Sequence, residues 1–132
     1  MLHELSGSAG NVIGLQADGP LTVADYQTWV PELLRRAESD PSGRIRVLIE
    51  MAGFEGWDSV AAFWEEIKSD AVLIGKVERL AIVAHSLADR LIADAAGVVM
   101  PGRVKAFDEE EMPAAWAWLK ATESDGTVPS SA

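Results

Sequence analysis

Few side chains in this sequence have the types and the spacing that catalysis or metal binding requires. The two histidines, His3 and His85, lie far apart in the chain, and there is no cysteine. A zinc site needs three or four ligands, usually with a close pair, so we expect no histidine-based metal site. The acidic run Glu109–Glu111 is better interpreted as a solvated start of a helix than as a cation site. We therefore expect no metal, no cofactor and no catalytic centre.

The pair His85-Ser86 follows an apolar run that predicts a strand. The carboxyl edge of a parallel sheet is where α/β folds bind ligands. A nucleophilic pair needs a base that faces the hydroxyl and a third group that orients the base, and adjacent residues do not supply this arrangement. We interpret Ser86 as a helix N-cap and His85 as a half-exposed side chain at a binding edge.

A second corner of this kind lies in VLIEMAGFEGWDSVAAFWEEIK, residues 47–68. Asp58 is a good N-cap for the helix that follows, and Trp57 precedes it at the position of a hydrophobic staple. We expect Ser59 in the first turn, with its hydroxyl partly exposed. The predicted ligand pocket or partner-binding edge consists of Phe54, Trp57, Asp58, Ser59, His85 and Ser86.

The overall charge argues against two classes of partner. The chain has 132 residues and a formal net charge of −10, from 11 basic and 21 acidic side chains. Nucleic acids and anionic membrane surfaces attract clustered Lys and Arg, so we expect neither as a partner. The sequence has no long apolar run and no basic start followed by an apolar stretch. We therefore expect a cytoplasmic protein with no membrane span and no signal peptide.

The order of apolar patterns and turn signals predicts an α/β domain with a mostly parallel sheet. The predicted strands are Leu2–Leu5, Asn11–Asp18, Ile45–Met51, Arg79–Ala84 and Val104–Phe107. The predicted helices are Thr22–Glu38, one capped by Asp58 and closed by Gly75, one capped by Ser86 and closed by Gly97, and one capped by Asp108. We expect residues 1–121 to form a single domain and residues 122–132 to be a flexible tail.

Three positions carry specific local expectations. Thr22 and Asp25 predict an acidic variant of the capping box at the start of the first helix. Pro31 lies inside this helix and should kink it without ending it. Gly14, inside the second strand, indicates a bulge or a close contact.

The tryptophans of the last helix point to an interface. Trp116 falls on the apolar stripe and is predicted to be in the core. Trp118 is about 200° further around the helix, outside that stripe, which makes it a candidate for an interface. Together with the first strand as a possible sheet edge, Trp118 predicts a homodimer.

From roughly Leu2 to Lys120, the chain resembles the SpoIIAA-like proteins, which share the fold of STAS domains and of CRAL-TRIO lipid carriers. The resemblance rests on the order of the elements and on the segments VLIEMAGFEGW, DSVAAFWEEIK and RLAIVA. It implies a (βα) superhelix with a mixed, mostly parallel five-stranded sheet and about four helices.

In STAS antagonists of anti-sigma factors, a serine at this strand-to-helix turn is phosphorylated within the motif Asp-Ser-[Ser/Thr]-Gly-Leu. Asp58-Ser59 matches the first half of this motif, whereas residues 60–62 do not match the second. A helix N-terminus accommodates a phosphate, but the nearby carboxylates of Glu55 and Asp58 would repel it. Phosphorylation of Ser59 is therefore an alternative to a purely structural corner.

The resemblance implies two classes of function. One is a regulatory module that acts through contacts with an unknown protein partner. The other is a carrier of a small apolar ligand, as in CRAL-TRIO proteins, although those domains are longer. An enzyme is the least favoured class, because no nucleophile, base and orienting group can be assembled from the sequence.

Overall fold

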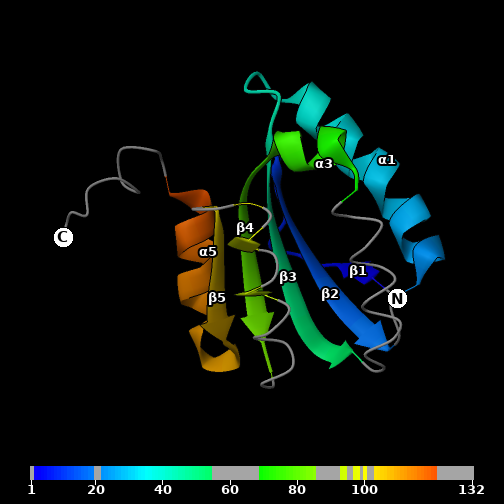
Figure 1. The fold of residues 1–132 in the computed structure, drawn as a ribbon. Coiled ribbons are helices and arrows are strands. Elements are labelled where there is room, and N and C mark those ends of the chain that lie inside the picture. Colours follow the sequence, from blue (N-terminus) through cyan, green and yellow to red (C-terminus); the bar gives the residue numbers. More distant parts are fainter. Residues whose placement is uncertain are drawn as a thin grey trace.

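A five-stranded sheet forms the centre of the protein (Figure 1). The computed structural model describes residues 2–19, 22–54, 69–85, 93–94, 97–98, 100 and 103–121. Its strands are β1 (Leu2–Glu4), β2 (Val12–Gly19), β3 (Ile45–Phe54), β4 (Val77–Ala84) and β5 (Val104–Asp108), which lie side by side in that order. β1 pairs antiparallel with β2, and all other neighbours are parallel. The predicted mixed, mostly parallel sheet is confirmed.

Helices cover both faces of this sheet. The described part of the chain contains α1 (Val23–Ser39), α3 (Ala71–Lys76) and α5 (Met112–Lys120), with a 3₁₀ turn, η1 (Glu109–Glu111), before α5. Three α-helices are therefore described, against about four expected. No helix in this part is long and apolar enough to cross a membrane.

Successive residues of β3 face two different cores, because side chains alternate across a strand. Val47 belongs to a cluster that α1 and α3 cover, and Leu48 belongs to a second cluster that α5 covers. Both side chains are almost completely buried. The continuous apolar run in this strand is thus explained by burial on both faces.

The start of α1 confirms the predicted capping box. Thr22 Oγ1 accepts from the Asp25 backbone N–H, and the Asp25 carboxylate accepts from the Thr22 backbone N–H. The helix then runs without a break through Pro31 to Ser39. The continuity of the helix is confirmed, and the kink at Pro31 stays a prediction.

The single helix predicted from Asp58 to Ile74 is wrong at its end. α3 begins only at Ala71, with Asp70 as its N-cap. Asp70 Oδ1 accepts from the Leu73 N–H at 3.0 Å, and Oδ2 accepts from the Tyr26 hydroxyl at 2.7 Å. These two bonds, the Leu73 N–H first, hold the pKa of Asp70 below its usual value. A carboxylate fixed in this way defines a new helix start.

Two glycines do not end helices as predicted. Gly75 lies inside α3, which continues to Lys76, and residues 97 and 98 are both helical. Among the described glycines, only Gly10 and Gly43 have a positive φ. Inside a helix, glycine costs about 0.5–1 kcal/mol relative to alanine, which tertiary contacts can offset. The helical conformation therefore includes both glycines, although the sequence predicted that each would end a helix.

The capping box predicted at Asp108 is present, since the Asp108 N–H donates to Glu111 Oε1 at 2.8 Å. Its first turn is a 3₁₀ helix, however, and α5 begins only at Met112. Short 3₁₀ turns are frequent at the starts of α-helices. The predicted last helix is therefore two elements.

Arginines near the amino ends of the strands hold the end of α5. Arg46 Nη1 donates to the carbonyl oxygen of Leu119 at 3.0 Å and to that of Ala121. Arg79 Nη1 donates to the carbonyl oxygen of Trp118 at 2.6 Å. The last carbonyls of a helix have no partner within the helix, and cations there also complement its dipole. These bonds fix α5 against the sheet.

Both tryptophans of α5 pack on the sheet. Trp116 contacts β2, because a Cβ atom added at Gly14 would lie 2.4 Å from the Trp116 ring. The close contact predicted at Gly14 is therefore confirmed. Trp118 is half-buried, with its ring centroid 6.0 Å from that of Phe107 and 5.5 Å from the Arg79 guanidinium. Phe107 and Arg79, on neighbouring strands, thus pack against part of the Trp118 ring, and its role in an interface stays a prediction.

Candidate functional site

The register of the sheet places four polar side chains in one row at its carboxyl edge. Gln16 of β2 pairs with Glu50 of β3, and Glu50 pairs with Val83 of β4. Since side chains alternate across a strand, His85, two residues beyond Val83, shares its face. Val83 also pairs with Phe107 of β5, two residues before Glu109. We call Gln16, Glu50, His85 and Glu109 the carboxyl-edge row.

These side chains contact one another across the strands. Gln16 Nε2 donates to Glu50 Oε1 at 3.2 Å. His85 Nε2 lies 3.2 Å from Glu50 Oε2, and its Nδ1 lies 2.8 Å from Glu109 Oε1. The side chain of Glu50 is 18% exposed and that of Glu109 is 57% exposed. The row therefore runs from a largely buried carboxylate out to a solvent-facing one.

The position of His85 between two carboxylates limits what the row can do chemically. Neutral imidazole has one N–H, so only the doubly protonated ring can donate to both Glu50 and Glu109. Among the described residues, no group of three or more histidine, cysteine and acidic side chains could hold a metal ion. The arrangement is suited to presenting a hydrogen-bonded carboxylate, Glu109, at the surface.

The structure describes only part of the site that the sequence predicts. His85 follows β4 at the carboxyl edge, and Phe54 is the last residue of β3, paired with Gly19. Trp57, Asp58, Ser59 and Ser86 lie outside the described residues, as does the helix start that Asp58 would cap.

Sequence reasoning missed the partners of His85. Gln16 and Glu50 are polar residues inside mostly apolar strands, and that signal could have identified them. Glu109 is an exposed residue at a helix start, as predicted, and its contact with His85 Nδ1 at 2.8 Å is what the sequence did not indicate.

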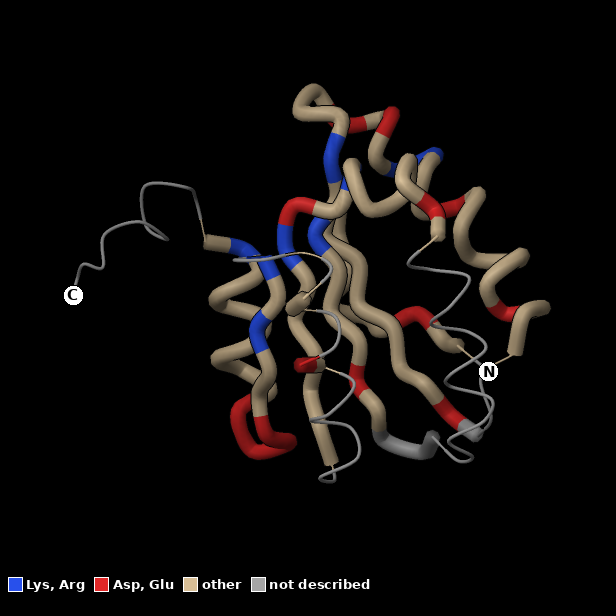
Figure 2. Tube along the Cα trace, in the orientation of Figure 1, with Lys and Arg blue, Asp and Glu red and all other residues tan. Residues whose placement is uncertain are grey.

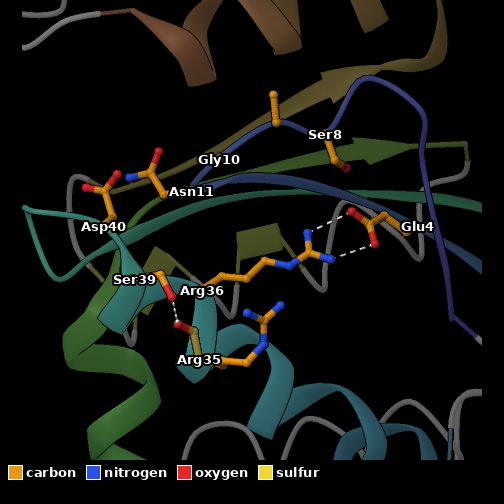
Figure 3. A pocket seen from close by; sticks show the side chains of 9 residues that line it. Glu4, Ser8, Gly10, Asn11, Arg35, Arg36, Ser39 and Asp40 are labelled. Atoms are coloured by element: carbon orange, nitrogen blue, oxygen red, sulfur yellow. Dashed lines mark hydrogen bonds and ion pairs between the residues drawn. The ribbon is translucent and has the colours of Figure 1, made fainter.

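An open, polar pocket of about 420 Å³ lies beside the carboxyl-terminal end of α1 (Figure 3). It is lined by Glu4, Ser8, Ala9, Gly10, Asn11, Arg35, Arg36, Ser39 and Asp40. Charged, hydroxyl and amide groups dominate this lining, so the pocket does not suit an apolar ligand.

The charges of this pocket are largely used within the protein. Arg36 donates two hydrogen bonds to the Glu4 carboxylate, at 2.7 and 2.8 Å, and Arg35 and Arg36 both donate to Glu32. These donors, Arg35 first, lower the pKa of Glu32 to about 2, and Arg36 lowers that of Glu4. Two cations and two carboxylates thus neutralise each other and tie β1 to α1.

Comparisons with known proteins agree with this architecture. A model of the SpoIIAA-like family matches residues 12–120. The chain is also similar to the crystal structure of an uncharacterised protein of the DUF3478 family with a SpoIIAA-like fold, from Shewanella loihica PV-4. The two chains are 22% identical, the match covers 90% of this chain and 92% of the other, and the TM-score is 0.60. No curated protein matches the chain significantly.

Proposed function

The chain belongs to the SpoIIAA-like family, and from this premise we propose that it is a binding module that acts through contacts with another protein. The carboxyl-edge row is the observation that carries the proposal. It gathers side chains from β2, β3, the end of β4 and η1. Four segments thus converge at one edge of the sheet, and the exposed Glu109 is the part of the row that a partner can reach most easily.

The charge of this edge indicates the chemistry of the partner. Glu109, Glu110 and Glu111 are all exposed, and Figure 2 shows the acidic turn at the carboxyl ends of the strands. The contact with His85 restricts the Glu109 side chain before a partner binds. This restriction lowers the conformational entropy lost when Glu109 forms an ion pair with the partner. The surface therefore fits a partner segment that carries Lys or Arg.

The corner of Phe54, Trp57, Asp58, Ser59 and Ser86 would extend this surface, because it follows the carboxyl end of β3 or β4. This extension stays a prediction, as does phosphorylation of Ser59, which would add negative charge next to the row. Incubation with a cognate anti-sigma kinase and ATP, followed by intact-mass measurement, tests the phosphorylation directly.

Site-specific photo-crosslinking in the cell of origin tests the binding surface. A photoreactive amino acid at position 110, in the acidic turn, is expected to give a discrete protein adduct. The same amino acid at position 27, an exposed site on α1, is the control and is expected to give none. Equal adducts from both positions, or none from position 110, would contradict the proposal.

The carrier of an apolar ligand is the competing class of function. Native mass spectrometry of protein purified from its own cells separates the two, because a bound lipid adds a discrete mass. A lipid adduct would favour the carrier, and a clean apo protein favours the module.

A homodimer is part of the same proposal. β1 lies at the edge of the described sheet, where an unpaired strand can pair with a second copy. Sedimentation at micromolar concentration is expected to show a dimer. A single species of 14.2 kDa would contradict it.

A further inference from the structure

Most cations in the described part of this acidic protein have no carboxylate partner. Of its nine Lys and Arg side chains, only Arg35, Arg36 and Arg46 pair with an acid. The other six are Arg44, Lys76, Arg79, Arg103, Lys105 and Lys120, which we call the amino-edge cations. In a chain with 21 acidic side chains, this separation of charge needs an explanation.

The amino-edge cations gather at one end of the sheet. Arg44, Lys76 and Arg103 each directly precede a parallel strand, namely β3, β4 and β5. Parallel strands start at the same edge, and the register places Arg44 level with Lys76 and Arg103 level with Arg79. Lys120 ends α5, whose last carbonyls bond to Arg46 and Arg79 from this edge. Figure 2 shows Lys and Arg at this end and the acidic turn at the other.

Contacts hold four of these cations in place without neutralising them. Arg79 donates to the Trp118 carbonyl, and Arg103 Nη1 donates to the carbonyl of Val77 at 2.7 Å. Lys105 Nζ lies 5.3 Å from the Phe107 ring centroid. Lys120 Nζ similarly lies 5.2 Å from the centroid of the Trp116 ring. A guanidinium has five N–H donors, so the arginines keep donors for a further acceptor.

Capping of helix ends accounts for only some of these positions. Arg79 donates to the end of α5, and Arg103 donates to carbonyls at the end of α3. Arg44 and Lys105 are exposed, and neither caps a described helix. Two acids near this edge have partners of their own, because Glu78 pairs with Arg46 and Asp40 accepts from Ser42.

We propose that the amino-edge cations form a second docking surface, which binds an acidic segment of a partner protein. The net charge of −10 disfavours a long polyanion such as RNA, whereas a short acidic segment can lie on the edge alone. A second copy that stacked its acidic edge end to end on this edge would form a head-to-tail contact, which generates rings or filaments and not the two-fold dimers that soluble proteins favour. The surface is independent of the carboxyl-edge row.

Fluorescence anisotropy with a labelled peptide of glutamate and glycine tests this surface. The wild-type protein is expected to bind the peptide, with an affinity that falls as salt screens the charges. The double variant Lys105→Gln/Lys120→Gln removes two exposed cations. We expect about tenfold weaker binding, because exposed ion pairs each contribute a few-fold.

The double variant Gln27→Glu/Thr28→Glu is the matched control. It changes the net charge by the same amount, at two exposed positions of α1. We expect its affinity to stay within about twofold of wild type. Thermal unfolding of all three proteins checks that the fold is unchanged.

Four results would overturn the proposal. One is no binding of the acidic peptide by the wild type at low salt. Another is an equal loss of affinity in both variants, which would show that binding depends only on net charge. Equal affinity for single-stranded RNA of the same length would assign the edge to nucleic acid. Salt-sensitive self-association that is lost only in Lys105→Gln/Lys120→Gln would assign it to a second copy.

Discussion

The two edges of the sheet use charged side chains in opposite ways. At the amino edge, Arg46 and Arg79 donate to main-chain carbonyls, so these cations hold a helix in place. At the carboxyl edge, Glu50, His85 and Glu109 contact one another through their side chains. Substitutions of Arg46 and Arg79 should therefore change stability, and substitutions in the outer part of the row should change binding.

Replacement of Arg46 by Met should have the largest effect on stability. It leaves Glu78 and the carbonyls of Leu119 and Ala121 without their donor. Loss of one hydrogen bond to a charged group costs about 1.5–3 kcal/mol. Because bonds that share a donor do not contribute additively, we expect the free energy of unfolding to fall by about 2–3 kcal/mol in total.

Urea unfolding at neutral pH measures this change. Arg44→Met is the matched control, because Arg44 is an exposed cation with no described acid partner. Its effect should stay within about 0.5 kcal/mol. Equal losses of unfolding free energy in the two variants would show that a cation bonded to the end of α5 contributes no more to stability than an exposed one.

Substitution of Gly14 by Ala tests how closely Arg46 and Arg79 hold α5 against the sheet. The added methyl group would lie 2.4 Å from the Trp116 ring, and overpacking of this kind costs about 1–3 kcal/mol. Gly75→Ala is the control, since nothing lies within 4 Å of its added Cβ atom. It should instead stabilise the protein by about 0.4–1 kcal/mol. A neutral Gly14→Ala would indicate that α5 can shift away from β2.

Acid should weaken the ion pairs between β1 and α1. Arg36 and Arg35 lower the pKa of Glu4 and Glu32 in the folded protein, the latter to about 2. A lowered folded pKa contributes stability above the unfolded value, here 4.5, and this stability is lost as the pH falls through the folded value.

The pH dependence can be read from urea midpoints between about pH 5 and pH 2. Glu4→Gln should reduce the slope over this range, because it removes one of the carboxylates whose pKa is lowered in the folded protein. A slope identical to that of wild type would show that the Glu4–Arg36 pair contributes nothing to stability.

Substitution of Glu109 by Gln should have the smallest effect on stability. Its carboxylate is more than half exposed and contacts only His85 among the described residues, so we expect a change within about 0.5 kcal/mol. The same substitution should weaken the crosslink from position 110, since it removes a charge from the proposed surface. A large loss of stability would instead make the carboxyl-edge row a structural element.

Local pattern was enough to predict most of the fold. The apolar runs of β3 and β4 and the capping box of Thr22 and Asp25 are all present. The errors lie where contacts from distant segments decide the outcome. Tyr26 and Leu73 both bond to Asp70 and start a new helix there, which no periodicity between residues 58 and 74 indicates.

The sequence by itself determined the elements, their order and the arrival of His85 at the carboxyl edge, because helices and strands follow from the spacing of apolar residues along the chain. Only the tertiary structure decided which side chains meet there. Gln16, Glu50 and Glu109 lie 69, 35 and 24 positions from His85 in the chain, and the register of the sheet brings them into one row. The half-burial of Trp118 was decided in the same way, by Arg79 of β4 and Phe107 of β5. Strand register depends on how entire faces pack together, so a local pattern does not contain it.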